Sequence, residues 1–284
     1  MVQDYLVSVI VCTMKENIAS CIESLLKQGY QNFEIIVVCT HAPRYNKDMD
    51  NTAPIRIEIA PKAGLSEARN LGIRLSKGDV ISFIDDDAVA DPCWLEALLN
   101  HIGEGFHIVG GPILPCYLAP QPSWWDERRF GHMVSVNTYT REIYGCNIAF
   151  TRDVVDALGG FSPKLGRHRR KMLSNEEREF VARAAVAGFK IGFFDDIRVK
   201  HLIDTNRLRF PYLIKRCWYQ GASDAILIKL GRTSLLKPSL RAFLKLCIHI
   251  IKLILTWMVP TVCIGSIFIV SAKLGFLCNL RVKI

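Results

Sequence analysis

The sequence predicts an α/β protein whose central sheet is mostly parallel and covered by helices on both faces. Three observations lead to this class. Short apolar runs rich in β-branched residues are typical of buried parallel strands. Between them lie segments with apolar residues at helical spacing, and the two kinds alternate regularly over about the first 200 residues. The 284 residues, half of them hydrophobic, suffice for one well-packed domain and an appendage.

The elements of the first half follow from these patterns in order. Strands are expected over Leu6–Cys12, Phe33–Cys39, Ile55–Ile59, Asp79–Ile84 and Phe106–Gly111. Helices are expected over Glu16–Gly29, Gly64–Ser76 and Pro92–His101. The stretch Pro112–Tyr144 is rich in proline and aromatic residues and has weak periodicity, which predicts irregular loops.

The second half continues with shorter elements. Strands are predicted at Gly145–Phe150, Ile191–Phe194 and Ile197–His201, and helices at Arg152–Leu158, Asn175–Ala187 and Arg209–Leu230. Further on, Leu253–Ala272 is 20 residues without a charge, which predicts a membrane-spanning helix kinked at Pro260. A buried helical hairpin or a segment lying in the membrane interface are the alternatives. We therefore expect a domain over residues 1–205, a basic connector over 206–240 and a membrane segment over 241–284.

Charge is unevenly distributed along the chain. The formal net charge is +9, and residues 200–284 alone hold 14 Lys or Arg against 2 Asp or Glu. A basic tail beside an apolar segment favours an anionic membrane surface over nucleic acid as partner. The ten cysteines form no CxxC pair and sit among apolar neighbours, so reduced thiols are expected. The N-terminus shows no signal-peptide pattern.

Three consecutive carboxylates, Asp85, Asp86 and Asp87, follow the apolar run that ends at Ile84. Open α/β sheets bind ligands at the carboxyl ends of their strands. Two carboxylates there can hold a hard divalent cation, which would offset their mutual repulsion. A solvated turn that caps the next helix is the alternative interpretation, because aspartate-rich turns are common.

The sequence resembles glycosyltransferase family 2 and its GT-A fold, a Rossmann-like sheet with helices on both faces. The matching segments span about the first 200 residues, and they are SVIVCT (8–13), EIIVV (34–38), GLSEARNLGIRLSKGDVISFIDDDAVADPCWLEAL (64–98), GCNIAFTRDVVDALGGF (145–161), NEEREFVARAAVAGFKIGF (175–193) and VKH (199–201).

The resemblance implies a donor site for a nucleotide-diphosphate sugar with Mg²⁺ or Mn²⁺. It assigns the metal to Asp85, Asp87 and His201, and donor binding to Thr13, Arg69, Asp85 and Asp86. Asp85 could instead face the ribose, and His201 could be a histidine packed at a strand end.

The family's acidic pair at the start of a helix corresponds to Glu176 and Glu177, with Glu177 as the base that deprotonates the acceptor hydroxyl. The alternative is that these acids only stabilise the helix N-terminus.

Two departures from the family pattern limit the prediction. Cys39 and Thr40 stand where acids commonly read the nucleotide base, so no particular nucleotide is predicted. The QxxRW motif of processive members has no match around Trp218, which favours transfer of a single sugar over polymerisation.

An arginine pair and a tryptophan pair each allow two interpretations. Arg169 and Arg170 could neutralise the departing nucleoside diphosphate or lie in a solvated loop. Trp124 and Trp125 could contact sugar rings or lipid headgroups or simply fill a core.

The sequence thus predicts an inverting, metal-dependent hexosyltransferase that acts on a lipid-linked or cell-surface glycan in polysaccharide biosynthesis, with its catalytic domain on the cytoplasmic side of a membrane. An inactive membrane-bound scaffold with the same fold is the first alternative. The second is a nucleotidyltransferase, which the lack of glycine in CTMKEN (12–17) disfavours.

Overall fold

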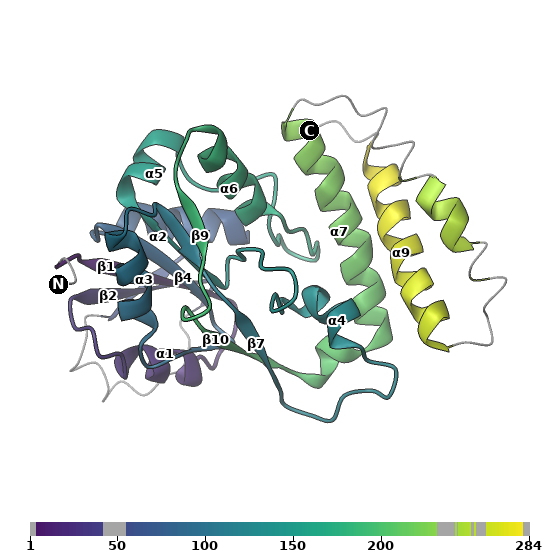
Figure 1. Cartoon of the computed structure of the whole chain (residues 1–284), viewed down its shortest axis with the longest axis horizontal. Helices are drawn as coiled ribbons and strands as arrows, with labels where there is room; N and C mark the ends of the chain where they lie inside the picture. The colour runs from purple at the N-terminus through teal and green to yellow at the C-terminus, as the bar shows by residue number, and fades with distance from the viewer. Residues whose placement is uncertain are drawn as a thin grey trace. The chain divides into compact units, whose positions relative to one another are not determined.

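A computed structural model of the chain describes residues 4–41, 55–231, 242, 244–250, 253 and 260–280 (Figure 1). Two compact units divide the chain, and each is built from separate stretches. The first unit comprises Met1–Cys116, Ser135–Ser162 and Glu177–Ile203, and the second comprises Tyr117–Val134, Pro163–Glu176 and Asp204–Ile284.

A seven-stranded sheet organises the first unit, in the order β3-β2-β1-β4-β8-β6-β9. Its strands are β1 (Val7–Thr13), β2 (Phe33–Cys39), β3 (Ile55–Ile59), β4 (Val80–Asp85), β6 (Ile108–Gly110), β8 (Asn147–Thr151) and β9 (Ile191–Phe193). β1 to β4 are parallel to one another, whereas β8 is antiparallel to both β4 and β6. The predicted α/β class with a mostly parallel sheet is therefore confirmed.

Both faces of this sheet are covered by helices, because successive strand residues point to opposite faces and both sets are apolar. On one face Val9 and Val37 pack against α1 (Ala19–Leu26) and α3 (Trp94–Gly103). On the other, Ile10 and Phe83 pack against α2 (Leu65–Leu75), α5 (Arg152–Leu158) and α6 (Glu176–Val186). Unbroken apolar strands of this kind are what burial on both faces requires.

A small second sheet, absent from the sequence prediction, lies beside the carboxyl end of β4. Its strands are β5 (Ala88–Ala90), β10 (Val199–Ile203) and β7 (Ile113–Tyr117), in the order β5-β10-β7. The prediction of loops throughout Pro112–Tyr144 is thus wrong, because β7, α4 (Glu127–Phe130) and the 3-10 helix η2 (Gly131–Val134) lie within it. β7 contains Pro115, and α4 and η2 have four residues each, so none of the three has a clear periodic pattern.

Gly72 of α2 provides a test of how closely this helix packs on the sheet. A Cβ atom at Gly72 would come within 2.5 Å of Ile10 Cγ2, and Ile10 is fully buried and β-branched. We expect Gly72→Ala to lower the free energy of unfolding by about 1–3 kcal/mol, because overpacking outweighs the gain in helix propensity. Urea denaturation measures the change.

Gly103→Ala in α3 is the matched control, since nothing lies within 4 Å of its Cβ position. That variant should be neutral or more stable by up to about 1 kcal/mol. Equal effects of the two substitutions would contradict the packing of α2 on β1.

The second unit is mainly helical. Its long helices are α7 (Phe210–Leu230) and α9 (Pro260–Asn279), and η3 (Thr205–Leu208) precedes α7. Two glycines let the long helices approach closely: a Cβ at Gly221 would meet the Ala272 carbonyl oxygen at 1.7 Å, and one at Gly275 would meet that of Trp218 at 2.0 Å. The two helices consequently run against each other, as Figure 1 shows.

The membrane-spanning helix expected over Leu253–Ala272 is not found. Within the ranges that the structure describes, no helix combines the length and apolar character needed to cross a bilayer. The described part of α9 runs from Pro260 past Lys273 to Asn279, and the predicted kink at Pro260 stays a prediction. Residues 254–259 of the expected segment lie outside the described residues.

Candidate active site

The three aspartates lie at the carboxyl edge of the main sheet, as the sequence predicts. β4 ends at Asp85, which stands opposite Cys12 of the parallel strand β1. Thr13, the last residue of β1, donates a hydrogen bond from Oγ1 to Asp86 Oδ2 at 2.5 Å. The parallel pairing of β1 and β4 therefore brings Thr13 and the aspartates together.

Lys15 was not singled out by the sequence analysis, yet it joins two of these carboxylates. Its Nζ lies 2.9 Å from Asp86 Oδ1 and 2.8 Å from Asp87 Oδ2. Its backbone N–H also donates to Thr13 Oγ1 at 2.9 Å, which orders the turn after β1. The signal that could have revealed Lys15 is its position two residues beyond a strand that neighbours β4.

His201 contacts Asp87 from the second sheet. β10 pairs with β5 so that His201 stands opposite Ala88, the residue after Asp87, and the Leu202 N–H donates to the Asp87 carbonyl. His201 Nε2 consequently lies 3.1 Å from Asp87 Oδ1, with both side chains buried. With Asp87 ionised, Nε2 carries the proton of this hydrogen bond, because a carboxylate only accepts.

Arg69 reaches the same edge from α2. It is 3% exposed, and its Nη2 lies 3.6 Å from Asp85 Oδ1. Its guanidinium lies over the rings of Phe83 and Phe161, at 5.7 and 5.4 Å from the centroids. A Cβ at Gly145 would come within 2.3–2.6 Å of the guanidinium, so only glycine leaves room for Arg69 there. The arginine is held in place by packing as well as by charge.

The pKa values at this edge follow from buried like charges. Burial raises the pKa of the Asp86 carboxyl, and the negative charge of Asp87 raises it further. Lys15 and Thr13 lower this pKa and offset part of the increase. Burial lowers the pKa of Lys15, but Asp87 and Asp86 outweigh it, so that its pKa is raised. Burial also raises the pKa of the Cys12 thiol to about 12, which excludes this cysteine as a thiolate nucleophile near neutral pH.

The residues at this edge fit a divalent cation. Among the described residues no three His, Cys, Asp or Glu side chains gather closely enough to enclose a metal by themselves. Mg²⁺ and Mn²⁺ sites, however, commonly use one or two protein ligands together with water and substrate phosphates. Asp87 offers carboxylate oxygens, and His201 would offer an imidazole nitrogen if its Nε2 released the proton that it donates to Asp87. Asp85, whose side chain is 35% exposed, lies two residues before Asp87. Lys15 pairs with Asp86 and Asp87, and Arg69 with Asp85, so cations already stabilise these carboxylates, and a metal would add further positive charge.

The second acidic site lies at the start of α6. Glu176 is buried, whereas Glu177 is partly exposed. Arg178 Nη2 lies 3.7 Å from Glu142 Oε1. Burial raises the pKa of Tyr144, and the carboxylates of Glu142 and Glu177 add to the increase. The segment that precedes β8 is thus in contact with the first turn of α6.

That same segment borders the aspartates. Gly145 is in contact with Arg69, and Cys146 lies beside Asp85, since β8 pairs with β4 through Asn147 and Ile84. Within the first unit, residues 142–147 therefore contact Arg178 in the first turn of α6 at one end and the Arg69–Asp85 pair at the other. This segment links the first turn of α6, which carries Glu177, to the carboxyl end of β4.

In the second unit, the residues that lead into α6 are fixed by a polar network. Asn175 adopts the left-handed conformation at φ 73° and is buried. Its Nδ2 donates to Asp224 Oδ1 at 2.8 Å, and Gln220 Nε2 donates to its Oδ1 at 2.9 Å. Ser174 N–H donates to Ser223 Oγ at 2.9 Å. The chain just before Glu176 and Glu177 therefore has a defined path along α7.

The remaining candidate residues belong to the second unit. Arg169 and Arg170 are exposed at the tip of the tight turn closed by His168 and Lys171, and their proposed charge role stays a prediction. Trp124 packs edge-on against Phe130 and Phe210, and Trp125 Nε1 donates to Tyr117 Oη at 3.0 Å. The two tryptophans, both partly exposed, belong to an aromatic cluster, and their contact with sugar rings or lipid headgroups stays a prediction.

Comparison with known proteins identifies the family of this chain. Residues 8–159 match the model of glycosyl transferase family 2. The glucosyl-dolichyl phosphate glucuronosyltransferase of Haloferax volcanii is 31% identical over 244 residues, which cover 78% of this chain and 77% of the relative. The α/β fold and the family match together define a sugar-transferring enzyme. The chain belongs to glycosyl transferase family 2.

More distant relatives extend the comparison. The succinoglycan biosynthesis protein ExoM of Rhizobium meliloti is 29% identical over 172 residues, 59% of this chain and 54% of that protein. Among solved structures, TarS of S. aureus superposes with a TM-score of 0.51 at 16% identity, covering 74% of this chain and 39% of TarS. This last likeness concerns the fold alone.

Proposed function

We propose that the protein is an inverting, metal-dependent transferase that moves one sugar from a nucleotide-diphosphate sugar to a hydroxyl of a lipid-linked acceptor. One observation carries the proposal: residues 142–147 run from the Arg69–Asp85 pair to the first turn of α6, the turn that carries Glu177. A donor diphosphate and an acceptor base are both needed at one place for a direct displacement.

The donor half of the reaction depends on charge. Lys15 and Arg69 are cations fixed by carboxylates at the strand ends, where they can also face a diphosphate. Asp86 holds Lys15 and Thr13 in position through its two oxygens. When bound at Asp87 and His201, Mg²⁺ or Mn²⁺ would supply positive charge toward the diphosphate. These groups together would stabilise the negative charge that develops on the leaving nucleoside diphosphate.

The acceptor half of the reaction depends on Glu177. Its partly exposed carboxylate can take the proton of the acceptor hydroxyl, whose oxygen then bonds to the anomeric carbon from the face opposite the diphosphate. The bond from that carbon to the diphosphate oxygen breaks with its electron pair, and the anomeric configuration inverts. Glu176 is buried, which makes it the weaker candidate for contact with substrate.

A lipid-linked acceptor on the cytoplasmic leaflet is supported by charge and by similarity. Residues 200–284 carry 14 Lys or Arg against 2 Asp or Glu, a balance suited to anionic headgroups. The relative from Haloferax volcanii is named for a dolichyl phosphate acceptor, and ExoM for polysaccharide biosynthesis.

The test is a screen of nucleotide-diphosphate sugars against lipid-linked sugar acceptors in the presence of Mn²⁺. We expect one glycosidic bond per acceptor, release of nucleoside diphosphate, and inversion at the anomeric carbon measured by NMR. Release of pyrophosphate would instead identify a nucleotidyltransferase. Donor binding without turnover across the screen would favour the inactive scaffold.

Removal of divalent cations should reduce transfer at least tenfold, because the buried carboxylates would then lack their neutralising charge. The initial rate is measured after EDTA treatment and gel filtration, and again after addition of Mn²⁺ or Mg²⁺, which should restore it. Mn²⁺ binding followed by electron paramagnetic resonance should weaken in His201→Ala. Full activity after exhaustive chelation would contradict metal dependence.

A further inference from the structure

The Lys15 ammonium lies in the position of a bound cation. Its Nζ is seated between two carboxylate oxygens, 2.9 Å from Asp86 Oδ1 and 2.8 Å from Asp87 Oδ2. The other oxygen of Asp87 lies 3.1 Å from His201 Nε2, so each oxygen of this carboxylate already contacts a hydrogen-bond donor. A divalent cation that binds Asp87 therefore has to displace one of these donors or lie close to it.

Lys15 is the more easily displaced of the two donors. His201 is fully buried, and the backbone around it is fixed because the Leu202 N–H donates to the Asp87 carbonyl. The Lys15 side chain is 43% exposed, and its charge lies at the end of a flexible four-carbon stem. Its backbone N–H, which donates to Thr13 Oγ1, can stay in place while the side chain turns toward solvent.

Arg69, the other cation at this edge, cannot move in the same way. Its side chain is 4% exposed, and its guanidinium is packed over two phenylalanine rings. Its contact with Asp85, at 3.6 Å, is also longer than either contact of Lys15. Of the two cations at the strand ends, Lys15 is therefore the one that can exchange with a metal ion.

Electrostatic repulsion favours such an exchange over binding side by side. An ammonium and a divalent cation on one carboxylate repel each other strongly at a site that water screens only in part. The Asp86 and Asp87 side chains are 12% and 9% exposed, so screening is limited here. When the metal leaves, the ammonium can return, and the two carboxylates have a neighbouring positive charge in both states.

We propose that Lys15 is an internal competitor for the divalent cation: its ammonium holds Asp86 and Asp87 when the metal is absent and leaves Asp87 when the metal binds. The inference rests on the proposed function for the identity of the metal site. It adds that the affinity for the cation is set by this exchange. Metal binding thus releases a positively charged side chain at the edge where the donor diphosphate is proposed to bind.

Mn²⁺ binding to the full chain without donor, followed by electron paramagnetic resonance, tests the competition. Lys15→Gln should tighten Mn²⁺ binding about fivefold or more, because the competing charge is removed. Lys15→Arg keeps that charge and should stay within threefold of the natural affinity. Lys77→Gln is the matched control, since it removes the same charge from an exposed lysine before the opposite end of β4. It should change the affinity less than twofold.

Melting temperature separates competition from a merely structural role. Without metal, Lys15→Gln should melt about 3 °C lower or more, because two largely buried carboxylates lose their partner. Saturating Mn²⁺ should raise its melting temperature more than that of the natural sequence, because it binds the metal more tightly. A lysine that only supported the fold would lower stability and metal affinity together.

A measurement on the natural sequence covers the case that Lys15→Gln folds poorly. The Lys15 Nζ resonance, assigned by NMR through its absence in Lys15→Arg, should move on saturation with Mg²⁺ toward that of a solvent-exposed lysine. Unchanged or weaker Mn²⁺ binding in Lys15→Gln, or a Lys15 resonance that saturating Mg²⁺ leaves in place, would overturn the inference.

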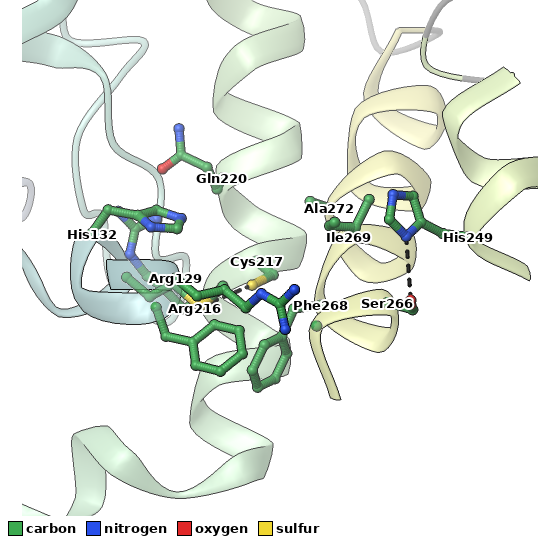
Figure 2. A pocket seen from close by; sticks show the side chains of 13 residues that line it. Arg129, His132, Arg216, Cys217, Gln220, His249, Ser266, Phe268, Ile269 and Ala272 are labelled. Carbon is green, nitrogen blue, oxygen red and sulfur yellow. Dashed lines mark hydrogen bonds between the residues drawn. The ribbon is translucent and has the colours of Figure 1, made fainter. Parts of the chain in front are cut away.

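Binding of the metal at another place is recognised with Asp87→Asn, which should weaken Mn²⁺ binding at the strand ends. The second unit contains a pocket of about 270 Å³ whose lining, shown in Figure 2, includes His132 and His249 but neither Asp nor Glu. It lacks the carboxylate oxygens that Mg²⁺ and Mn²⁺ prefer.

The outcomes distinguish this inference from the proposed function. Tighter Mn²⁺ binding in Lys15→Gln, without sugar transfer by the natural sequence, would refute the proposed function alone. Metal-dependent transfer together with equal Mn²⁺ affinities of Lys15→Gln and the natural sequence would refute this inference alone. Absence of Mn²⁺ binding in both proteins would refute both.

Discussion

Asp87→Asn should lower kcat/KM for sugar transfer about 100-fold or more while the protein stays folded. Asp87 is 8% exposed, and its two oxygens contact different elements: His201 Nε2 at 3.1 Å on β10 and Lys15 Nζ at 2.8 Å after β1. The amide has the same shape but no charge, so it removes electrostatic stabilisation and one metal ligand at once. Loss of one well-placed electrostatic contact typically costs two to three orders of magnitude in rate.

Steady-state kinetics with the donor from the screen measure this effect, and circular dichroism monitors folding. Asp195→Asn is the control, since it neutralises an exposed carboxylate of the same unit that pairs with Arg141. It should change kcat/KM less than twofold. A folded Asp87→Asn enzyme within threefold of normal activity would contradict the role assigned to the aspartates.

Glu177→Gln should lower kcat by about 100- to 10,000-fold and leave donor affinity nearly unchanged. The reason is that only the proton acceptor is lost, whereas the groups facing the diphosphate remain. Glu177 is partly exposed at the first turn of α6, so its replacement by an isosteric amide should leave the helix intact.

Single-turnover rates and donor titration separate the two effects. Glu179→Gln is the matched control two residues along, where the carboxylate pairs with Arg183 in the same helix at 2.8 Å. That variant should lose little beyond the modest stability of a helix ion pair, about 0.5 kcal/mol. Equal kinetic losses in the two variants would mean that α6 was perturbed and that Glu177 has no special role.

The long strands could be predicted from sequence because they are short apolar runs rich in β-branched residues, a pattern typical of buried strands. The predicted bounds Phe33–Cys39 and Ile55–Ile59 coincide with β2 and β3, and β1 and β4 differ from prediction by one residue at each end. β5, with three residues, has no periodic signal, although its pairing with β10 brings His201 to Asp87. The antiparallel direction of β8 depends on long-range pairing, which local patterns do not encode.

The candidate site was predictable in part for the same reason. Thr13 and the aspartates meet because parallel strands end at one edge, a rule that needs only the strand assignments. The role of Lys15 was not predicted, because a lysine after a strand is usually solvated. Its contacts with two carboxylates depend on the turn that follows β1. Arg69 required the glycine at position 145, far away in sequence, to leave room for its guanidinium.

A crystal structure of the protein with Mn²⁺ and the nucleoside diphosphate of its donor tests the central claim most directly. Anomalous scattering should locate manganese on Asp87 and His201, with the diphosphate facing Lys15 and Arg69 and the Glu177 carboxylate on the acceptor side of the same cavity. Manganese or nucleotide bound elsewhere, or a Glu177 side chain directed away from the bound donor, would contradict the account.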